Sequence, residues 1–147
     1  EGGTDEDVAE AIFLHKGIGC YTHGDVEVQY TDQNDYINRV RFFRPVYKDI
    51  FIKVVLKKYT GYISTMTVKV REAVYSYLAA LTIGSDVSAS VLSNIITDCN
   101  PSLTKPIFGI KELKLGLSKS SMAAQDIDIG FKEIPNPAYA NIEVTLE

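Results

Sequence analysis

The stretch from Ile50 to Leu81 constrains the fold more than any other part of the chain. It begins with an apolar run in which every second residue is a large aliphatic side chain: Ile50, Ile52, Val54 and Leu56. Alternation with a period of two predicts a strand with one buried face. The intervening residues mix Phe51 and Val55 with lysines. We therefore expect the other face of this strand to be half covered.

A helix follows the strand after a short turn at residues 57–62. Between Thr65 and Leu81 the hydrophobic residues recur with helical spacing and form one stripe: Val70, Val74, Tyr77, Leu78 and Leu81. Ser64 or Thr65 can accept hydrogen bonds from the free N–H groups at the helix start, and Gly84 follows its end. Since the strand and the helix each have one face to bury, we expect them to pack against each other.

The chain after Leu81 supplies the rest of the predicted domain. A second helix is expected from Ser88 to Cys99, capped by Ser88 or Asp86. Residues 107–117 and 126–134 alternate as strands and would form a hairpin around the small polar loop 118–125, and residues 141–145 form a short last strand. Residues 46–147 are therefore predicted to form a two-layer α+β domain of βααββ order and ferredoxin-like type. Its sheet would be mainly antiparallel, with both helices on one face.

Residues 1–45 are predicted to form a separate segment, a short helix followed by a β-hairpin. The helix spans Thr4–Leu14, with Thr4 and Asp7 spaced as a capping box. Its apolar face would consist of Val8, Ala11, Ile12 and His15. The hairpin joins strands at 26–30 and 39–43, and Pro45 ends the second strand. We interpret this segment as the end of an upstream domain or a linker.

Charge and apolar run length bear on the classes of partner. The net charge is −4, which argues against a nucleic-acid groove and against binding to anionic membranes, because both require clustered Lys and Arg. The apolar runs are far shorter than the roughly 18–20 residues that span a bilayer. We therefore expect neither nucleic acid nor membrane as a partner.

The residue types of a metal site occur together in one stretch: His15, Cys20, His23 and Asp25. Zn²⁺ uses such ligands, but their spacing matches no zinc signature, and the glycines between them favour an irregular turn. A Cys20–His23 nucleophile pair has no residue to orient its base, and the Gly17–Gly19 stretch lacks the third glycine of a dinucleotide-binding motif. We predict no enzyme activity, catalytic residue, cofactor or metal. A small metal- or ligand-binding α+β module that uses these four residues is the alternative.

Two groups of residues are candidates for an assembly interface. The first group is Arg39, Arg41 and Arg44, which would contact an anion or an acidic partner. The alternative, which we favour, is a solvated strand face that pairs with Glu27 or Asp25 across the hairpin. The second group is Tyr59 and Tyr62, which flank Gly61 in the turn after the strand at Ile50–Leu56. Tyrosine is enriched where protein surfaces meet. The predicted interface residues are Arg39, Arg41, Arg44, Tyr59 and Tyr62.

Several stretches, in this order, resemble one family. They are Gly2–Asp5 with Val8–Ile12, Gly17-Ile18 with Thr22–Val26, Val40–Phe42 with Arg44-Pro45, Val70–Val74 leading into Ile83–Val87, and Asn141–Val144. Together they resemble the C-terminal portion of the baseplate J-like proteins, which are structural proteins of contractile phage tails and related injection machines.

The resemblance implies a wedge component of a baseplate that makes protein–protein contacts and has no enzyme activity. Its partners would be other baseplate or tail proteins, or further copies of itself. It would be located in the tail baseplate of the virion, or in the host bacterial cytoplasm during assembly. We expect the hairpin at Val26–Phe43 to contact a neighbouring subunit by strand addition.

Overall fold

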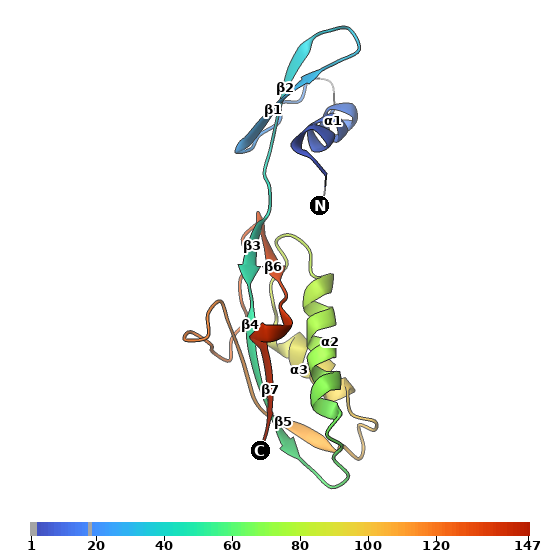
Figure 1. Cartoon of the computed structure of the whole chain (residues 1–147), viewed down its shortest axis with the longest axis vertical. Helices are drawn as coiled ribbons and strands as arrows, with labels where there is room; N and C mark the ends of the chain where they lie inside the picture. The colour runs from blue at the N-terminus through green and yellow to red at the C-terminus, as the bar shows by residue number, and fades with distance from the viewer. Residues whose placement is uncertain (1–2, 18) are drawn as a thin grey trace. The chain divides into compact units, whose positions relative to one another are not determined.

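The computed structural model describes residues 3–17 and 19–147. Gly2 and Ile18, which belong to the stretches quoted for the family resemblance, lie outside the described residues. The chain divides into two compact units, Glu1–Pro45 and Val46–Glu147 (Figure 1). This division falls at Pro45, where the sequence places the boundary. Each unit has a hydrophobic cluster of its own.

The first unit consists of helix α1 (Asp5–His15) and an antiparallel hairpin of β1 (Val26–Thr31) and β2 (Ile37–Phe42). Both were expected. The capping box is present, because Thr4 Oγ1 accepts from the Asp7 N–H at 3.2 Å and the Asp7 carboxylate accepts from the Thr4 N–H at 3.0 Å. Between the helix and the hairpin, Gly24 lies so close to the backbone of Phe42 that a Cβ atom would come within 2.1 Å of it.

The buried face of α1 is rotated from the predicted one. Ala9 is fully buried and Phe13 packs on Tyr30 with ring centroids 4.7 Å apart, whereas Ala11 and His15 are exposed. Burying the large Phe13 ring gains more free energy than burying Ala11 and His15. The face towards the hairpin therefore consists of Val8, Ala9, Ile12 and Phe13.

The second unit is an α+β fold in which two helices cover one face of a small sheet. The central strand β4 pairs antiparallel with β5 and parallel with β7, and β3 pairs with β6 in a separate parallel pair. Its elements are β3 (Val46–Asp49), β4 (Phe51–Lys58), α2 (Met66–Ala80), α3 (Ala89–Asp98), β5 (Phe108–Gly116), β6 (Glu133–Asn136), a 3₁₀ turn (Tyr139–Asn141) and β7 (Ile142–Leu146).

The pairing corrects the expectation of a mainly antiparallel sheet for residues 46–147. The sheet is mixed, because the antiparallel strand β5 returns the chain to the start of β4, where Gly116 lies opposite Phe51. From there the chain runs on into β7, which therefore pairs parallel with β4. The order of elements also differs from the β-α-β-β-α-β order of a ferredoxin-like domain, since α2 and α3 follow one another directly.

The strand predicted at residues 126–134 does not form as a hairpin partner of β5, and only its last two residues belong to a strand, β6. Ala123 and Leu115 exchange backbone hydrogen bonds of 2.8 Å, so the chain turns back as expected, but Ile127 then pairs with Val87 at 3.0 Å. The Ile129 N–H donates to Asp86 Oδ1 at 2.8 Å. Ile127 and Ile129 are buried, so their alternation reflects contact with the core and not membership of a hairpin.

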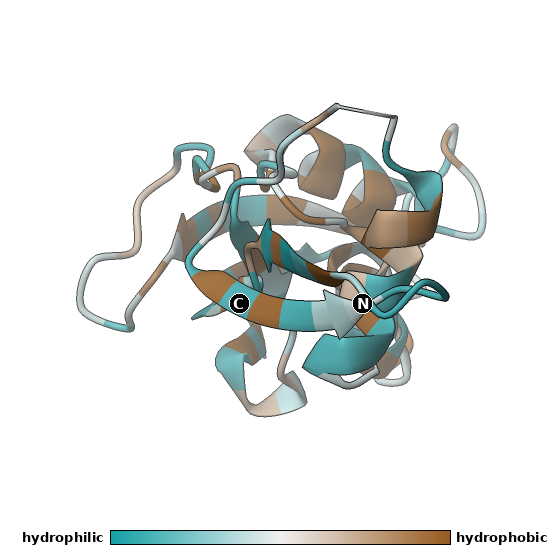
Figure 2. Ribbon diagram, turned by 90° about the horizontal axis from the view of Figure 1, so that it is seen from above, coloured by the Kyte–Doolittle hydropathy of each residue, from teal (hydrophilic) through white to brown (hydrophobic). Residues whose placement is uncertain are grey.

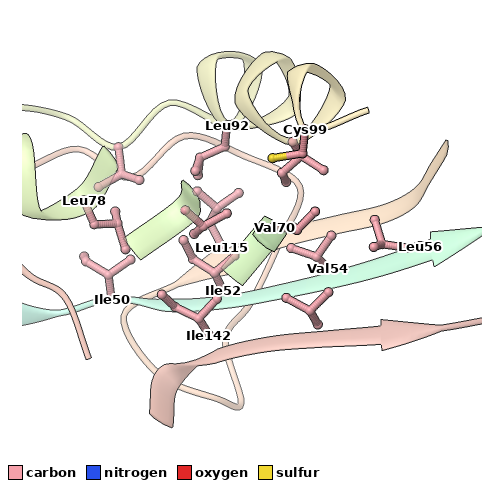
Figure 3. Packing of buried hydrophobic residues seen from close by; sticks show 14 of the residues in the cluster. Ile50, Ile52, Val54, Leu56, Val70, Leu78, Leu92, Cys99, Leu115 and Ile142 are labelled. Carbon is pink, nitrogen blue, oxygen red and sulfur yellow. The ribbon is translucent and has the colours of Figure 1, made fainter. Parts of the chain in front are cut away.

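The predicted faces of the central strand and helix are confirmed. Ile50, Ile52, Val54 and Leu56 are at most 1% exposed. They pack against both α2 and α3, which therefore cover the same face of the sheet (Figure 3). The residues of the two helices in this cluster include Val70, Val74, Leu78, Leu92 and Ile96. Figure 2 shows hydrophobic and hydrophilic residues alternating along strands, as expected where one face is buried.

The helix caps differ from the predicted ones. Neither Thr65 at the start of α2 nor Ser88 at the start of α3 makes a side-chain cap hydrogen bond. Instead, Asp126 Oδ1 accepts from the Ala89 N–H at 2.8 Å. A residue far along the chain thus satisfies the first turn of α3, which local spacing does not reveal.

Candidate assembly surface

The outer edge of β2 leaves backbone groups unpaired. Hydrogen-bonded pairs alternate along an antiparallel ladder. The Asp32 N–H bonds to the Tyr36 carbonyl at 3.0 Å, so in the observed register the N–H groups of Ile37, Arg39 and Arg41 point away from β1. Thr22 Oγ1 accepts from the Arg41 N–H at 2.8 Å. Among the described residues, the N–H groups of Ile37 and Arg39 have no such partner.

A groove of about 580 Å³ runs along this edge. We call it the β2 groove. Two of the side chains that line it are apolar or aromatic and well exposed: Ile37 at 67% and Tyr21 at 102%. The described residues that line it contain no carboxylate: Lys16, Gly19, Cys20, Tyr21, Thr22, Ile37, Asn38, Arg39 and Arg41.

The β2 groove carries a surplus of positive charge in an acidic chain. Arg41 Nε donates to Glu27 Oε2 at 2.7 Å, and Arg39 Nε lies 3.9 Å from Glu27 Oε1. These contacts confirm the favoured interpretation that both arginines pair with Glu27 across the hairpin. One carboxylate nevertheless faces two guanidinium groups. Among the described residues, the Lys16 ammonium donates to the Cys20 carbonyl alone, at 3.3 Å, and it lies over the Phe13 ring.

Arg44 lies elsewhere and has an internal contact. Its Nε and Nη2 both donate to Asp5 Oδ1, at 2.9 and 2.6 Å, and Nη2 also donates to the Gly3 carbonyl at 3.0 Å. Its guanidinium also lies 5.4 Å from the centre of the Phe42 ring. Arg44 therefore ties the start of α1 to the end of β2, and it does not line the groove.

The two tyrosines of the turn contact their own unit. Tyr59 is 43% exposed, but its ring lies against Gly109 so closely that a Cβ atom there would be 2.5 Å from the hydroxyl. Tyr62 packs against the core of the second unit, and burial raises the pKa of its hydroxyl. Of the pair, Tyr59 alone offers a large exposed area.

The four candidate metal ligands do not converge. His15 Nδ1 lies 2.8 Å from the Ala11 carbonyl within α1, Cys20 is exposed, and the His23 ring packs edge-on against Phe43. Within residues 3–17 and 19–147, no three His, Cys, Asp or Glu side chains are placed to hold a metal ion. The alternative function therefore has no site built from these residues in the described part of the chain.

Sequence reasoning missed the role of Asn100. This buried side chain accepts from the N–H groups of Ile107 and Phe108 at 2.9 and 3.3 Å, and donates to the carbonyls of Thr97 and Phe108 at 3.1 and 3.3 Å. In the sequence, an Asn-Pro pair after a helical stretch indicates only the end of the helix. A single amide before a loop is a signal too common to indicate such a role.

No model of a known family matches the sequence, and no curated protein matches it significantly. No helix in the described part of the chain combines the length and apolarity needed to cross a bilayer.

Proposed function

We propose that this chain is a structural component of the baseplate of a contractile phage tail or a related injection device. It acts through protein–protein contacts and has no catalytic role. Its partners are other baseplate or tail proteins or further copies of itself, and its place is the virion baseplate, or the host cytoplasm during assembly. The ordered resemblance to baseplate J-like proteins motivates the family, and the β2 groove motivates the mode of contact.

The free edge of β2 is the observation that carries the proposal. Two outward N–H groups, of Ile37 and Arg39, can extend the two-stranded ladder by one more strand. The exposed Ile37 and Tyr21 side chains supply apolar contact area, and the unneutralised cations favour an acidic partner segment. A two-stranded hairpin gains stability from a third strand, so such a contact stabilises both proteins.

The test compares two substitutions at one position. Ile37→Ala and Ile37→Pro both remove the exposed side chain, but only proline also removes the outward N–H group. The chain is co-expressed with the proteins encoded beside its gene, and complexes are measured by size-exclusion chromatography with light scattering. We expect a complex with the parent, weaker assembly with Ile37→Ala, and none with Ile37→Pro.

Charge reversal supplies a second arm. Arg41→Glu should leave the chain folded, because the Arg41 side chain is 51% exposed and an exposed ion pair contributes about 1 kcal/mol at most, yet it should impair assembly. Lys58→Glu, on the exposed end of β4 in the other unit, is the matched control. Normal assembly of Ile37→Pro and Arg41→Glu would exclude the β2 edge, and failure of the full-length protein to assemble with any tail protein would exclude the baseplate role.

A further inference from the structure

Arg71 on α2 is the one arginine of the sequence without a carboxylate partner among the described residues. Arg39 and Arg41 lie beside Glu27, and Arg44 binds Asp5. Within residues 3–17 and 19–147, Arg71 has no such ion-pair partner, and its Nε is a buried donor without a hydrogen-bond partner. A buried donor without a hydrogen-bond partner destabilises the fold, and more so when its group is charged. The described residues therefore leave part of the hydrogen-bonding capacity of the Arg71 guanidinium unused.

Arg71 lines an open cleft of about 470 Å³ in the second unit. The cleft lies where the first residues of β4 and β7 meet the 3₁₀ turn. Two further cations line it, Lys53 on β4 and Lys119 in the loop after β5. Neither forms an ion pair within the described ranges. Glu143 is the single carboxylate among the lining residues, so the cleft carries a positive surplus.

Most of the other lining residues of the cleft are apolar or aromatic and are held in place. They include Phe51, Met122 and Tyr139. Met122 belongs to a loop that folds onto Gly116, where an added Cβ atom would lie 3.0 Å from the Met122 Cα. The Tyr139 ring packs against Tyr75 with centroids 4.5 Å apart. The backbone bridge between Leu115 and Ala123 anchors the loop, so these walls exist without a ligand.

We propose that this cleft is a binding site for an oxyanion, a carboxylate or phosphate group, carried on a small apolar body. The Arg71 guanidinium supplies planar donors that match such a group, and Lys53 and Lys119 supply compensating charge. The apolar walls contact the body of the ligand. Glu143 opposes binding by repulsion. The site is a property of the second unit and does not depend on the contacts of the hairpin.

The test is a titration followed by amide NMR shifts of the whole chain, at ionic strength held constant with NaCl. The probes are inorganic phosphate, phenyl phosphate and benzoate. We expect saturable shifts confined to the residues around the cleft, with phenyl phosphate binding more tightly than inorganic phosphate. If benzoate alone or phenyl phosphate alone saturates, the oxyanion is identified as carboxylate or phosphate.

Substitutions distinguish specific binding in the cleft from nonspecific attraction of an anion to exposed lysines and arginines. Arg71→Gln should weaken phenyl phosphate binding at least about tenfold, the effect of losing charge-assisted hydrogen bonds. Glu143→Gln should tighten it, and Lys57→Gln, which removes an exposed charge on β4 outside the cleft, should change it less than about twofold. Lys119→Gln, in an exposed loop, should also weaken phenyl phosphate binding. It replaces Arg71→Gln as the test variant if Arg71→Gln does not fold.

Three results would overturn the proposal. The first is an absence of saturable shifts at the cleft with all three probes. The second is shifts spread over lysines across the molecule. The third is that Arg71→Gln binds phenyl phosphate as tightly as the parent does. If Arg71→Gln does not fold, the same result with Lys119→Gln would overturn the proposal.

Discussion

Replacing Asn100 with alanine tests whether one buried side chain holds the loop between α3 and β5. Asn100 is 8% exposed, and its amide makes four hydrogen bonds to backbone groups. The substitution removes all four without altering the backbone. It leaves the N–H groups of Ile107 and Phe108 without the acceptor that they share.

The magnitude follows from the groups that lose their partner. The Thr97 carbonyl also accepts from the Asn100 N–H. The Phe108 carbonyl has no such substitute among the described residues, because the N–H of Lys58, which lies opposite Phe108, donates to the Glu147 carbonyl. The two N–H groups have no substitute. An unsatisfied buried donor costs about 1–3 kcal/mol, and one of these bonds is long at 3.3 Å. We expect Asn100→Ala to lower the free energy of unfolding by about 2–4 kcal/mol.

The assay is urea unfolding followed through NMR signals of the second unit, because the chain has no tryptophan and the two units can unfold separately. The midpoint should fall while the dependence on urea stays unchanged. Exchange of the amide protons of Ile107 and Phe108 should accelerate before other β5 protons. Asn94→Ala, at an exposed position of α3, is the control and should change stability by less than about 0.5 kcal/mol. An Asn100→Ala variant as stable as this control would refute the reasoning.

Three further predictions concern the core, a cap and pH. Val74→Asp should unfold the second unit, because Val74 is 0% exposed and an isolated buried carboxylate costs several kcal/mol; a circular dichroism melt like that of the parent would contradict this. Asp126→Ala should destabilise the second unit by about 1 kcal/mol in urea unfolding, because it removes the cap of α3, and an unchanged midpoint would show that water replaces the cap. The hydrogen bond from the Thr4 N–H lowers the folded-state pKa of Asp7 below its ordinary 3.8. The stabilisation of α1 should therefore be complete above that value and be lost as the pH falls through the lower, folded-state pKa, which helical amide shifts followed from pH 6 to 2 would reveal.

Local pattern predicted the elements whose burial depends on near neighbours. The alternation of Ile50–Leu56, the stripe of α2, the capping box of α1 and the β1–β2 hairpin are all encoded within about fifteen residues. In each, a period of 2 or 3.6 is visible because one face is buried. These features are enough to place the chain in the α+β class.

Strand pairing and the candidate sites depend on distant contacts and could not be predicted in the same way. Strand β6 contains Pro135, and a proline within a run of residues argues against a central strand. In the described part of the chain β6 pairs with β3 alone, so it is an edge strand, where a missing N–H is tolerated. The β2 groove forms because Thr22 bonds to β2. The lack of a carboxylate partner for Arg71 among the described residues can be seen only in the structure, where the positions of the carboxylates are known.

The parallel pairing of β4 with β7 has a consequence for how the protein is made. Thr145 bonds to the Val54 carbonyl across 91 residues of chain. While a ribosome synthesises the intervening segment, β4 has β5 on one side at most, and its other edge is exposed to solvent and to other nascent chains. Long-range pairing of this kind forms slowly and exposes the chain to aggregation. The yield of soluble protein should therefore depend on how quickly translation proceeds from β4 to β7.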